Sequence, residues 1–496
     1  MNLELETASH PENLKRVAID PVSRVEGHGK VTLLLDENNR VHQVRLHIVE
    51  FRGFEKFIQG RPFWEVPVMV QRLCGICPVS HHIAASKAMD MIVGAVKLTK
   101  TAEMNRRLMH YGQILQSHAL HFFHLCSPDL LFGFDSDVAR RNIVGVAQAY
   151  PDIARKGVLL RKYGQEIIRM TAGKKVHGTG SIPGGVNKSL SADERKSLLQ
   201  EIYQMVSWCI EAVDIVKRLF EQNAQFYSQF GRFDSRSLSM VRADGAMDLY
   251  HGGLRARDTL GEKIFDHFDY RHYWEVISED VKSWSYMKFP FLQSLGPEAG
   301  WYRVGPLSRV TNCDFIPTPL ADRERREFLA FDDGRASGAT LGYHWARMIE
   351  MLHAAETIKD LLHEDDIEGG ELMAEGGERA GRGVGVIEAP RGTLIHHYRV
   401  NEDDLVIRAN LIVSTTHNNQ AMNEAIRQVA LQYLDGNEIT EGLLNHIEVA
   451  IRAFDPCLSC ATHALGQMPL EVVVQDFAGN PVSIASRSPE GVFSSR

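Results

Sequence analysis

Two cysteine pairs with the same spacing lie near opposite ends of this 496-residue chain. One is Cys74-Gly-Ile-Cys77 and the other is Cys457-Leu-Ser-Cys460. A CxxC pair presents two thiolates to one centre, so two pairs together can supply the four ligands of a metal site. If they do so here, the two ends of the chain have to meet and belong to one folded unit.

The composition agrees with one large soluble unit. With 44% hydrophobic residues and no low-complexity stretch, the chain can bury a sizeable core. The formal net charge of −8, without a long basic cluster, argues against nucleic acid as a partner. Met1–Ile19 has no apolar signal region, and no apolar run is long enough to span a membrane. We therefore expect a cytoplasmic protein.

The pattern of apolar residues predicts a mainly helical α+β fold. Gly29–Leu35 and Val41–Ile48 alternate apolar and polar side chains around a turn, which is typical of a β-hairpin. Leu470–Gln475 and Val482–Ala485 predict a second hairpin at the C-terminus. Helical periodicity predicts long helices at His82–Leu98, Ala102–Cys126, Ser191–Phe230, Asp322–Leu362, Gln420–Leu434 and Thr440–Phe454. We expect a large helical bundle core with small sheets, in which both CxxC pairs meet at a buried site.

The simplest interpretation of two cysteine pairs is a structural zinc site. Three features favour another one: the chain is large enough to fold without a metal, the pairs do not bracket one short knuckle, and other reactive residues accompany each pair. A thioredoxin-like dithiol would need a βαβ surrounding that the sequence does not indicate. Thiolates favour nickel, iron and zinc, and a redox function selects nickel or iron. The two patterns are Arg72-x-Cys74-Gly-x-Cys77-x-x-x-His81 and Asp455-Pro-Cys457-x-x-Cys460-x-x-His463.

These motifs resemble a known family. RLCGICPVSH and DPCLSCATH are similar to the paired motifs of the large subunits of [NiFe]-hydrogenases in both halves, their order and their separation. Details around His81-His82 and Thr415–Asn423 are similar to the cytoplasmic NAD-reducing branch. The resemblance implies reversible, heterolytic cleavage of H2 into protons and electrons. It covers essentially the whole chain, because it continues through Arg24-Val-Glu26-Gly-His28, Arg52-Gly-Phe-Glu55, Glu388-Ala-Pro-Arg391-Gly and Thr415-Thr-His-Asn418.

The resemblance implies a role for each cysteine of the two pairs. Cys74 and Cys457 would be terminal nickel ligands. Cys77 and Cys460 would bridge the nickel to an iron that carries carbon monoxide and cyanide. His81 would donate a hydrogen bond to a bridging sulfur and so tune the metals. Taken alone, His81 would be a buried histidine at a helix start.

Other residues would surround the metal pair. Arg391 would lie over the open metal position, where a fixed guanidinium stabilises developing charge, and Asp455 would orient it. Thr415 would place a hydroxyl near a cyanide ligand. Ser117 and Ser414 stand where periplasmic relatives have aspartate and proline, respectively.

The resemblance also implies a magnesium site and a route for protons. Glu55, His463 and the Leu394 carbonyl resemble magnesium ligands, although an imidazole is unusual for so hard an ion. A thiolate such as that of Cys457 can take the proton released from H2, and Glu26 matches the carboxylate that passes it on.

Electrons have to leave through another chain. The other cysteines, Cys126, Cys209 and Cys313, are too scattered to hold an iron–sulfur cluster and are expected to be ordinary buried thiols. The resemblance implies a small subunit with such a cluster and diaphorase subunits that bind FMN and NAD. No NAD site is expected on this chain, because its Gly-rich connectors lack the strand–turn–helix context of a dinucleotide-binding turn.

Finally, the resemblance implies that the chain has two parts. Residues 1–463 would form the large-subunit domain, and 464–496 would be a C-terminal extension that a maturation endopeptidase removes after metallochaperones have delivered the metals. Two alternatives remain open. One is a methanogen-type cytoplasmic hydrogenase with another electron acceptor, and the other is a non-enzymatic structural-zinc subunit of a redox complex.

Overall fold

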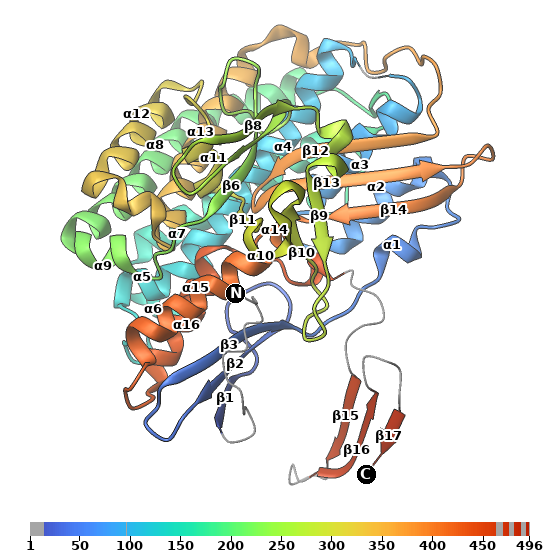
Figure 1. Ribbon diagram of the computed structural model, residues 1–496. Coiled ribbons are helices and arrows are strands. Elements are labelled where there is room, and N and C mark those ends of the chain that lie inside the picture. Colours follow the sequence, from blue (N-terminus) through green and yellow to red (C-terminus); the bar gives the residue numbers. More distant parts are fainter. Residues whose placement is uncertain (1–13, 96, 463–469, 476–480, 488–492, 496) are drawn as a thin grey trace.

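The computed structural model describes residues 14–95, 97–462, 470–475, 481–487 and 493–495. Long helices pack against one another on one side of the molecule, and small sheets lie around them (Figure 1). The predicted helix-rich fold with small sheets is therefore confirmed. Among the described residues, no helix has both the length and the apolar character needed to cross a membrane.

The long helices form the core. They are α3 (Pro78–Ile92), α4 (Lys100–Leu120), α7 (Pro151–Ala172), α8 (Ala192–Gln222), α12 (Pro319–Ala330), α13 (Gly342–His363), α15 (Asn419–Val429) and α16 (Glu441–Ala453). Shorter helices are α1 (Phe54–Phe57), α2 (Val66–Met69), α5 (Ser127–Phe132), α6 (Ile143–Ala149), α9 (Ala224–Gln229), α10 (Gly296–Ala299), α11 (Pro306–Asn312) and α14 (Ser414–His417). Cys126, Cys209 and Cys313 are buried free thiols, as predicted.

The predicted N-terminal hairpin has the expected boundaries. β2 (Gly29–Leu35) and β3 (Val41–Ile48) pair antiparallel, and β1 (Lys15–Ile19), which was not predicted, adds a third strand beside β2. The C-terminal hairpin was also predicted correctly as β15 (Leu470–Gln475) and β16 (Pro481–Arg487), and β17 (Phe493–Ser495) extends it. These strands form two separate three-stranded sheets.

Four further groups of strands were missed from the sequence. β12 (Arg382–Ala389), β13 (Gly392–Val400) and β14 (Val406–Ile412) form an antiparallel sheet. A second sheet has the order β11 (Tyr302–Arg303), β6 (Arg236–Val241), β7 (Gly253–Arg257) and β8 (Lys263–Phe268). Two-stranded pairs are formed by β9 (Ile277–Asp280) with β10 (Phe289–Leu292) and by β4 (Ser181–Ile182) with β5 (Gly185–Val186).

The contact between α3 and β12 positions the first cysteine pair. A Cβ atom at Gly383 or Gly385 would lie 1.9 Å from the carbonyl oxygen of Ala88 or Ala84, respectively. Only glycine at both positions lets the helix rest directly on the strand. Because Cys77 immediately precedes α3, this close approach fixes the height of its sulfur above the sheet.

Two predicted helices are interrupted, for local reasons. The predicted Ser191–Phe230 helix begins with the expected capping box but ends at Gln222, because the Asn223 side chain caps the next helix by accepting from Phe226 N. The predicted Asp322–Leu362 helix is broken between α12 and α13, where Asp332, Asp333 and Gly334 have positive φ angles. Helix α7 was missed altogether.

Candidate metal centre

The two cysteine pairs meet, as predicted. The Sγ atoms of Cys74 and Cys457 lie 3.2 Å apart, and those of Cys457 and Cys460 lie 2.7 Å apart. All four donor atoms are within 4.8 Å of one another and all four side chains are buried. Such a set of converging soft ligands fits a nickel–iron centre, and its chemistry also admits zinc.

Local hydrogen bonds position Cys74 and Cys457. Cys74 follows a short 3₁₀ segment, Val70–Leu73, and its Sγ accepts hydrogen bonds from Ile76 N and Cys77 N at 3.2 and 3.1 Å. Cys457 follows α16 through Asp455, a non-glycine residue with a φ of 55°. Cys457 N donates to Thr415 Oγ1 at 2.9 Å, so Thr415 positions the second pair. These contacts set the positions of both pairs in the folded chain.

The thiols do not ionise independently. Hydrogen bonds with Cys457, Cys460 and Cys74 lower the pKa of the Cys77 thiol well below its usual value. Burial raises the pKa of the Cys457 and Cys460 thiols well above theirs. The four thiols therefore form one electrostatically linked group, in which hydrogen bonding and burial oppose each other.

Arg391 and Asp455 form a buried ion pair beside the thiols. Arg391 lies in the turn between β12 and β13, and its Nη2 donates to Asp455 Oδ1 at 3.0 Å. Its Nη1 is 3.4 Å from Ser117 Oγ, so the serine contacts the arginine directly. Burial raises the pKa of Asp455, and Arg391 opposes this shift. The carboxylate thus restricts the orientation of the guanidinium.

A small cavity of about 10 Å³ separates the arginine from the thiols. Cys77, His81, Arg391, Thr415 and Cys457 are among the residues that line it. Leu394 and Ser414 also lie on its wall. This volume has room for roughly one water-sized molecule, so only a very small molecule fits beside the sulfurs.

Glu26 reaches the second cysteine pair from the N-terminal segment. Its Oε2 accepts from Cys457 Sγ at 3.0 Å and from Ser459 N at 3.2 Å. Glu26 and Cys457 also form a parallel backbone bridge. Gly27 makes this approach possible, because a Cβ atom at its φ of 81° would lie 2.7 Å from Ser459 N.

His81 also contacts the cluster. A hydrogen bond from His81 contributes to the lowered pKa of Cys77. Its Nδ1 is 3.1 Å from His396 Nε2, and His396 Nδ1 is 2.6 Å from the Tyr398 hydroxyl. The ring is therefore held between a thiol and a second histidine.

The predicted magnesium ligands are only partly described. Glu55 Oε1 accepts from Leu411 N at 2.8 Å and lies 3.5 Å from Lys288 Nζ. Leu394 lies in β13 opposite Ile387, and His463 falls outside the described residues. Because an ammonium group already faces the Glu55 carboxylate, the described donors do not by themselves fit a hard divalent cation.

Several residues of the site were missed from the sequence. His396 supports His81, and Glu50 Oε2 accepts from Ser459 Oγ at 3.0 Å. Arg309 bonds Glu350 and Glu388 and thereby anchors the end of β12 next to Arg391. His396 lies only five residues after Arg391, so the motif around Arg391 could have drawn attention to it. Glu50, Arg309 and Glu350 are brought to the site by long-range packing, which leaves no local signal in the sequence.

Comparison with known proteins gives consistent matches. A family model described as nickel-dependent hydrogenase matches residues 52–134 and 255–463, and one described as HoxL-like matches residues 16–51. The beta subunit of the NAD-reducing hydrogenase HoxS of Cupriavidus necator is 48% identical over 95% of this chain and 100% of its own length. An F420-non-reducing hydrogenase subunit of Methanothermobacter thermautotrophicus is 40% identical over 94% of this chain and 99% of its own.

Solved structures agree. The crystal structure of an NAD+-reducing [NiFe]-hydrogenase in the H2-reduced state has a TM-score of 0.89 and 58% identity, and the match covers 90% of this chain and 99% of that one. A [NiFeSe]-hydrogenase of Dm. baculatum, 22% identical with a TM-score of 0.73 over 91% of this chain and all of its own, has the same fold. With four buried thiols brought together from both ends of the sequence, these matches show that the chain belongs to the nickel-dependent hydrogenases, as a large catalytic subunit.

Proposed function

We propose that this hydrogenase subunit cleaves H2 for the reduction of NAD+ and works in the cytoplasm. Its electrons would pass to an iron–sulfur cluster on a small subunit and then to diaphorase subunits that bind FMN and NAD. The observation that carries the proposal is the four-thiol cluster with Glu26 at 3.0 Å and the Arg391–Asp455 pair beside it. The NAD-reducing branch is supported by 48% identity to the HoxS beta subunit.

The four cysteines would hold the nickel–iron centre. Cys74 and Cys457 would be terminal ligands, and Cys77 and Cys460 would bridge to an iron that carries carbon monoxide and cyanide. When bound, this centre supplies the Lewis-acid and redox chemistry that H2 cleavage needs. Cys77 and Thr415 both line the cavity of about 10 Å³ beside the thiols.

Arg391 would stabilise charge that develops in this cavity. Its guanidinium lies in the cavity wall, and Asp455 and Ser117 restrict its movement. A fixed, buried positive group stabilises a polarised transition state without the cost of reorganisation that water would add. Because the cavity admits only a very small molecule, it also excludes larger reactants.

Glu26 would carry protons away from Cys457. The carboxylate oxygen is within hydrogen-bond reach of the thiol, which is the geometry that proton transfer requires. Ser459 next links Glu26 to Glu50, through its backbone N and its hydroxyl. Glu50 Oε1 lies 2.5 Å from Nδ1 of His28, whose side chain is 66% exposed. Polar groups thus extend from the sulfur toward solvent, and a proton on Glu26 would reach Glu50 by way of water, because the Ser459 backbone N–H does not relay one.

Exposed apolar side chains support the presence of a partner subunit. Five large apolar side chains that precede the first cysteine pair are more than a third exposed, whereas most residues of this type are buried: Val49, Phe51, Phe57, Trp64 and Val68. They lie within one stretch of 20 residues, and apolar side chains that stay exposed near one another can mark a protein interface. We infer that the small subunit covers them, which would bring its cluster close to the metal centre.

The C-terminal extension would be removed during maturation. Cys457, Cys460 and Thr462 are fully enclosed, and residues 464–496 follow directly. A segment that closes over metals has to be placed after the metals have entered, so release of its end by an endopeptidase would complete the site. A magnesium ion held by Glu55, the Leu394 carbonyl and His463 stays a prediction; Lys288 Nζ, 3.5 Å from Glu55 Oε1, would have to move aside for it.

The first prediction concerns the metals. The purified complex should contain nickel and iron and show infrared bands of carbon monoxide and cyanide on iron. Cys77→Ser should lose both metals, because a harder ligand replaces a bridging thiolate. Cys209→Ala, which removes a buried thiol in α8, should keep them. Zinc without such bands would instead support a structural subunit.

The second prediction isolates the proton route. Glu26→Gln keeps the shape of the side chain but removes the titratable group, so exchange of H2 with D2O per nickel should fall by about 100-fold or more. Glu448→Gln is the matched control, because Glu448 is half-buried and its carboxylate is engaged by Ser23 N and Arg452 instead of a thiol. Normal exchange at full nickel content in Glu26→Gln would exclude Glu26 from the mechanism.

The third prediction concerns the acceptor. The purified complex should reduce NAD+ under H2. Reduction of a viologen dye without any reduction of NAD+ would favour the methanogen-type alternative, which is supported by 40% identity to F420-non-reducing hydrogenases. Rates with NAD+ and with the dye, measured on the same preparation, distinguish the two.

The fourth prediction concerns the extension. Mass spectrometry of the large subunit in active enzyme should show a chain that ends at or close to His463. In Cys77→Ser the full chain should remain, because metal insertion is expected to precede cleavage. An active enzyme that retains residues 464–496 would contradict the proposed maturation.

A further inference from the structure

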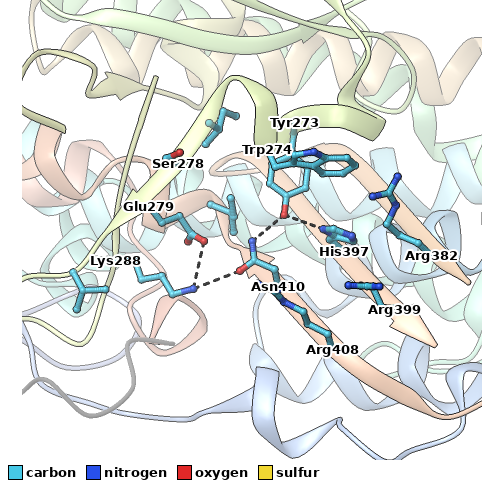
Figure 2. Close-up of a pocket in the computed structure, with 13 residues that line it drawn as sticks. Tyr273, Trp274, Ser278, Glu279, Lys288, Arg382, His397, Arg399, Arg408 and Asn410 are labelled. Carbon is cyan, nitrogen blue, oxygen red and sulfur yellow. Dashed lines mark hydrogen bonds and ion pairs between the residues drawn. The ribbon is translucent and has the colours of Figure 1, made fainter. Parts of the chain in front are cut away.

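A pocket of about 570 Å³ lies against the β12–β13–β14 sheet (Figure 2). Arg382 lines it, whereas Gly383 and Gly385 contact α3, so the pocket and α3 lie on opposite faces of the sheet. A 3₁₀ segment, Tyr270–Glu275, and strand β9 form its other walls. Its volume is in the range of sites that bind small molecules. The metal centre does not use it, because none of the four cysteines lines it.

Three arginines lie side by side across the floor of this pocket. Arg382 of β12 is opposite Arg399 of β13, and Arg399 is opposite Arg408 of β14. Neighbouring strands lie about 4.8 Å apart, so the row spans roughly 10 Å. Like charges directly opposite each other destabilise a sheet, so this arrangement requires an explanation.

No acidic residue in the described part of the chain neutralises the row. None of the three arginines has an ion-pair partner there within 4.0 Å, whereas Arg255 of the neighbouring sheet is paired with both Asp266 and Asp314. Lys288 also lines the pocket, but Glu279, 3.4 Å away, already offsets its charge. The pocket therefore carries about three uncompensated positive charges in a chain whose net charge is −8.

The wall beside the row is organised by aromatic residues. The Arg382 guanidinium lies 4.4 Å from the centroid of the Trp274 ring, and the His397 ring stacks on Trp274 at 5.3 Å. The Tyr273 hydroxyl accepts from Asn410 Nδ2 at 2.9 Å and lies 3.2 Å from His397 Nδ1. Burial is the main cause that lowers the pKa of His397 to about 4, and the positive charges of the three arginines lower it further. The histidine therefore adds no charge at neutral pH.

We propose that this pocket binds a small, multiply charged oxyanion of the phosphate-ester or diphosphate class. Guanidinium groups present paired donors that match phosphate oxygens, and three of them in a row match an anion that carries several such oxygens. The concave, walled shape favours a small molecule over the flat surface of a protein partner. This inference concerns a site separate from the thiol cluster and does not depend on the proposed electron acceptor.

Inorganic pyrophosphate is the probe that tests the proposal. Its binding to the assembled complex is measured by calorimetry in a chloride buffer of low ionic strength, where charge interactions are least screened. Wild type should bind it, and Arg399→Gln should bind it about tenfold more weakly or worse. Arg140→Gln is the matched control, because Arg140 is also exposed and lies over an aromatic ring, Phe132, but outside the pocket. It should bind as wild type does.

A second measurement separates binding from folding. Without pyrophosphate, the melting temperature of Arg399→Gln should equal or exceed that of wild type, because the substitution removes the central member of a repulsive row. Arg408→Gln provides the same comparison at the end of the row. Absence of pyrophosphate binding to wild type, or equal binding to Arg399→Gln, would overturn the proposal. Loss of a subunit from the Arg399→Gln complex would overturn it too, because the row would then bind an acidic group of a partner protein.

Discussion

The contact between Cys74 Sγ and Cys457 Sγ, 3.2 Å apart, joins segments that are 383 residues apart in the sequence. Closing so long a loop has a large entropic cost, which the packing of everything between the two segments has to offset. Helix α3 carries the first pair and rests on β12, while α16 leads into the second. The long helices and the sheet together therefore set the positions of four sulfur atoms. The N-terminal segment then closes the site, through the Glu26–Cys457 bridge.

Buried charges hold the loops around this contact. Arg309 bonds Glu350 at 2.5 Å and Glu388 at 2.7 Å, and Glu350 in turn lies 2.8 Å from His118. Although burial alone would raise it, the pKa of Glu350 is lowered to about 2, chiefly by Arg309. Removing one member of such a buried pair typically costs about 3–5 kcal/mol, because the other charge is left without a partner. The network therefore fixes the end of β12, and with it the turn that presents Arg391.

What the sequence could predict depended on how local the signal was. The hairpin of β2 and β3, the Ser191 capping box and the CxxC pairs are short patterns, and each was predicted correctly. The β12–β14 sheet was missed because β12 is buried on both faces and reads Gly-Val-Gly-Val, without alternation of polar and apolar residues. The resemblance to a family supplied Glu26, Arg391 and Asp455, whereas Ser459, Glu50 and Arg309 became visible only once distant segments had been brought together.

The order of the segments along the sequence determines how metals can enter the site. The four sulfurs are nearly inaccessible, and the second pair is held by Thr415, Glu26 and the backbone bond from Leu458 N to the Glu26 carbonyl. These partners all precede the second pair in the sequence, so they can be in place before the C-terminal segment docks. The last element to dock is then the one that covers the thiols. A metal centre can be assembled on the open first pair and then enclosed by the second, which supports removal of the extension as the final step of maturation.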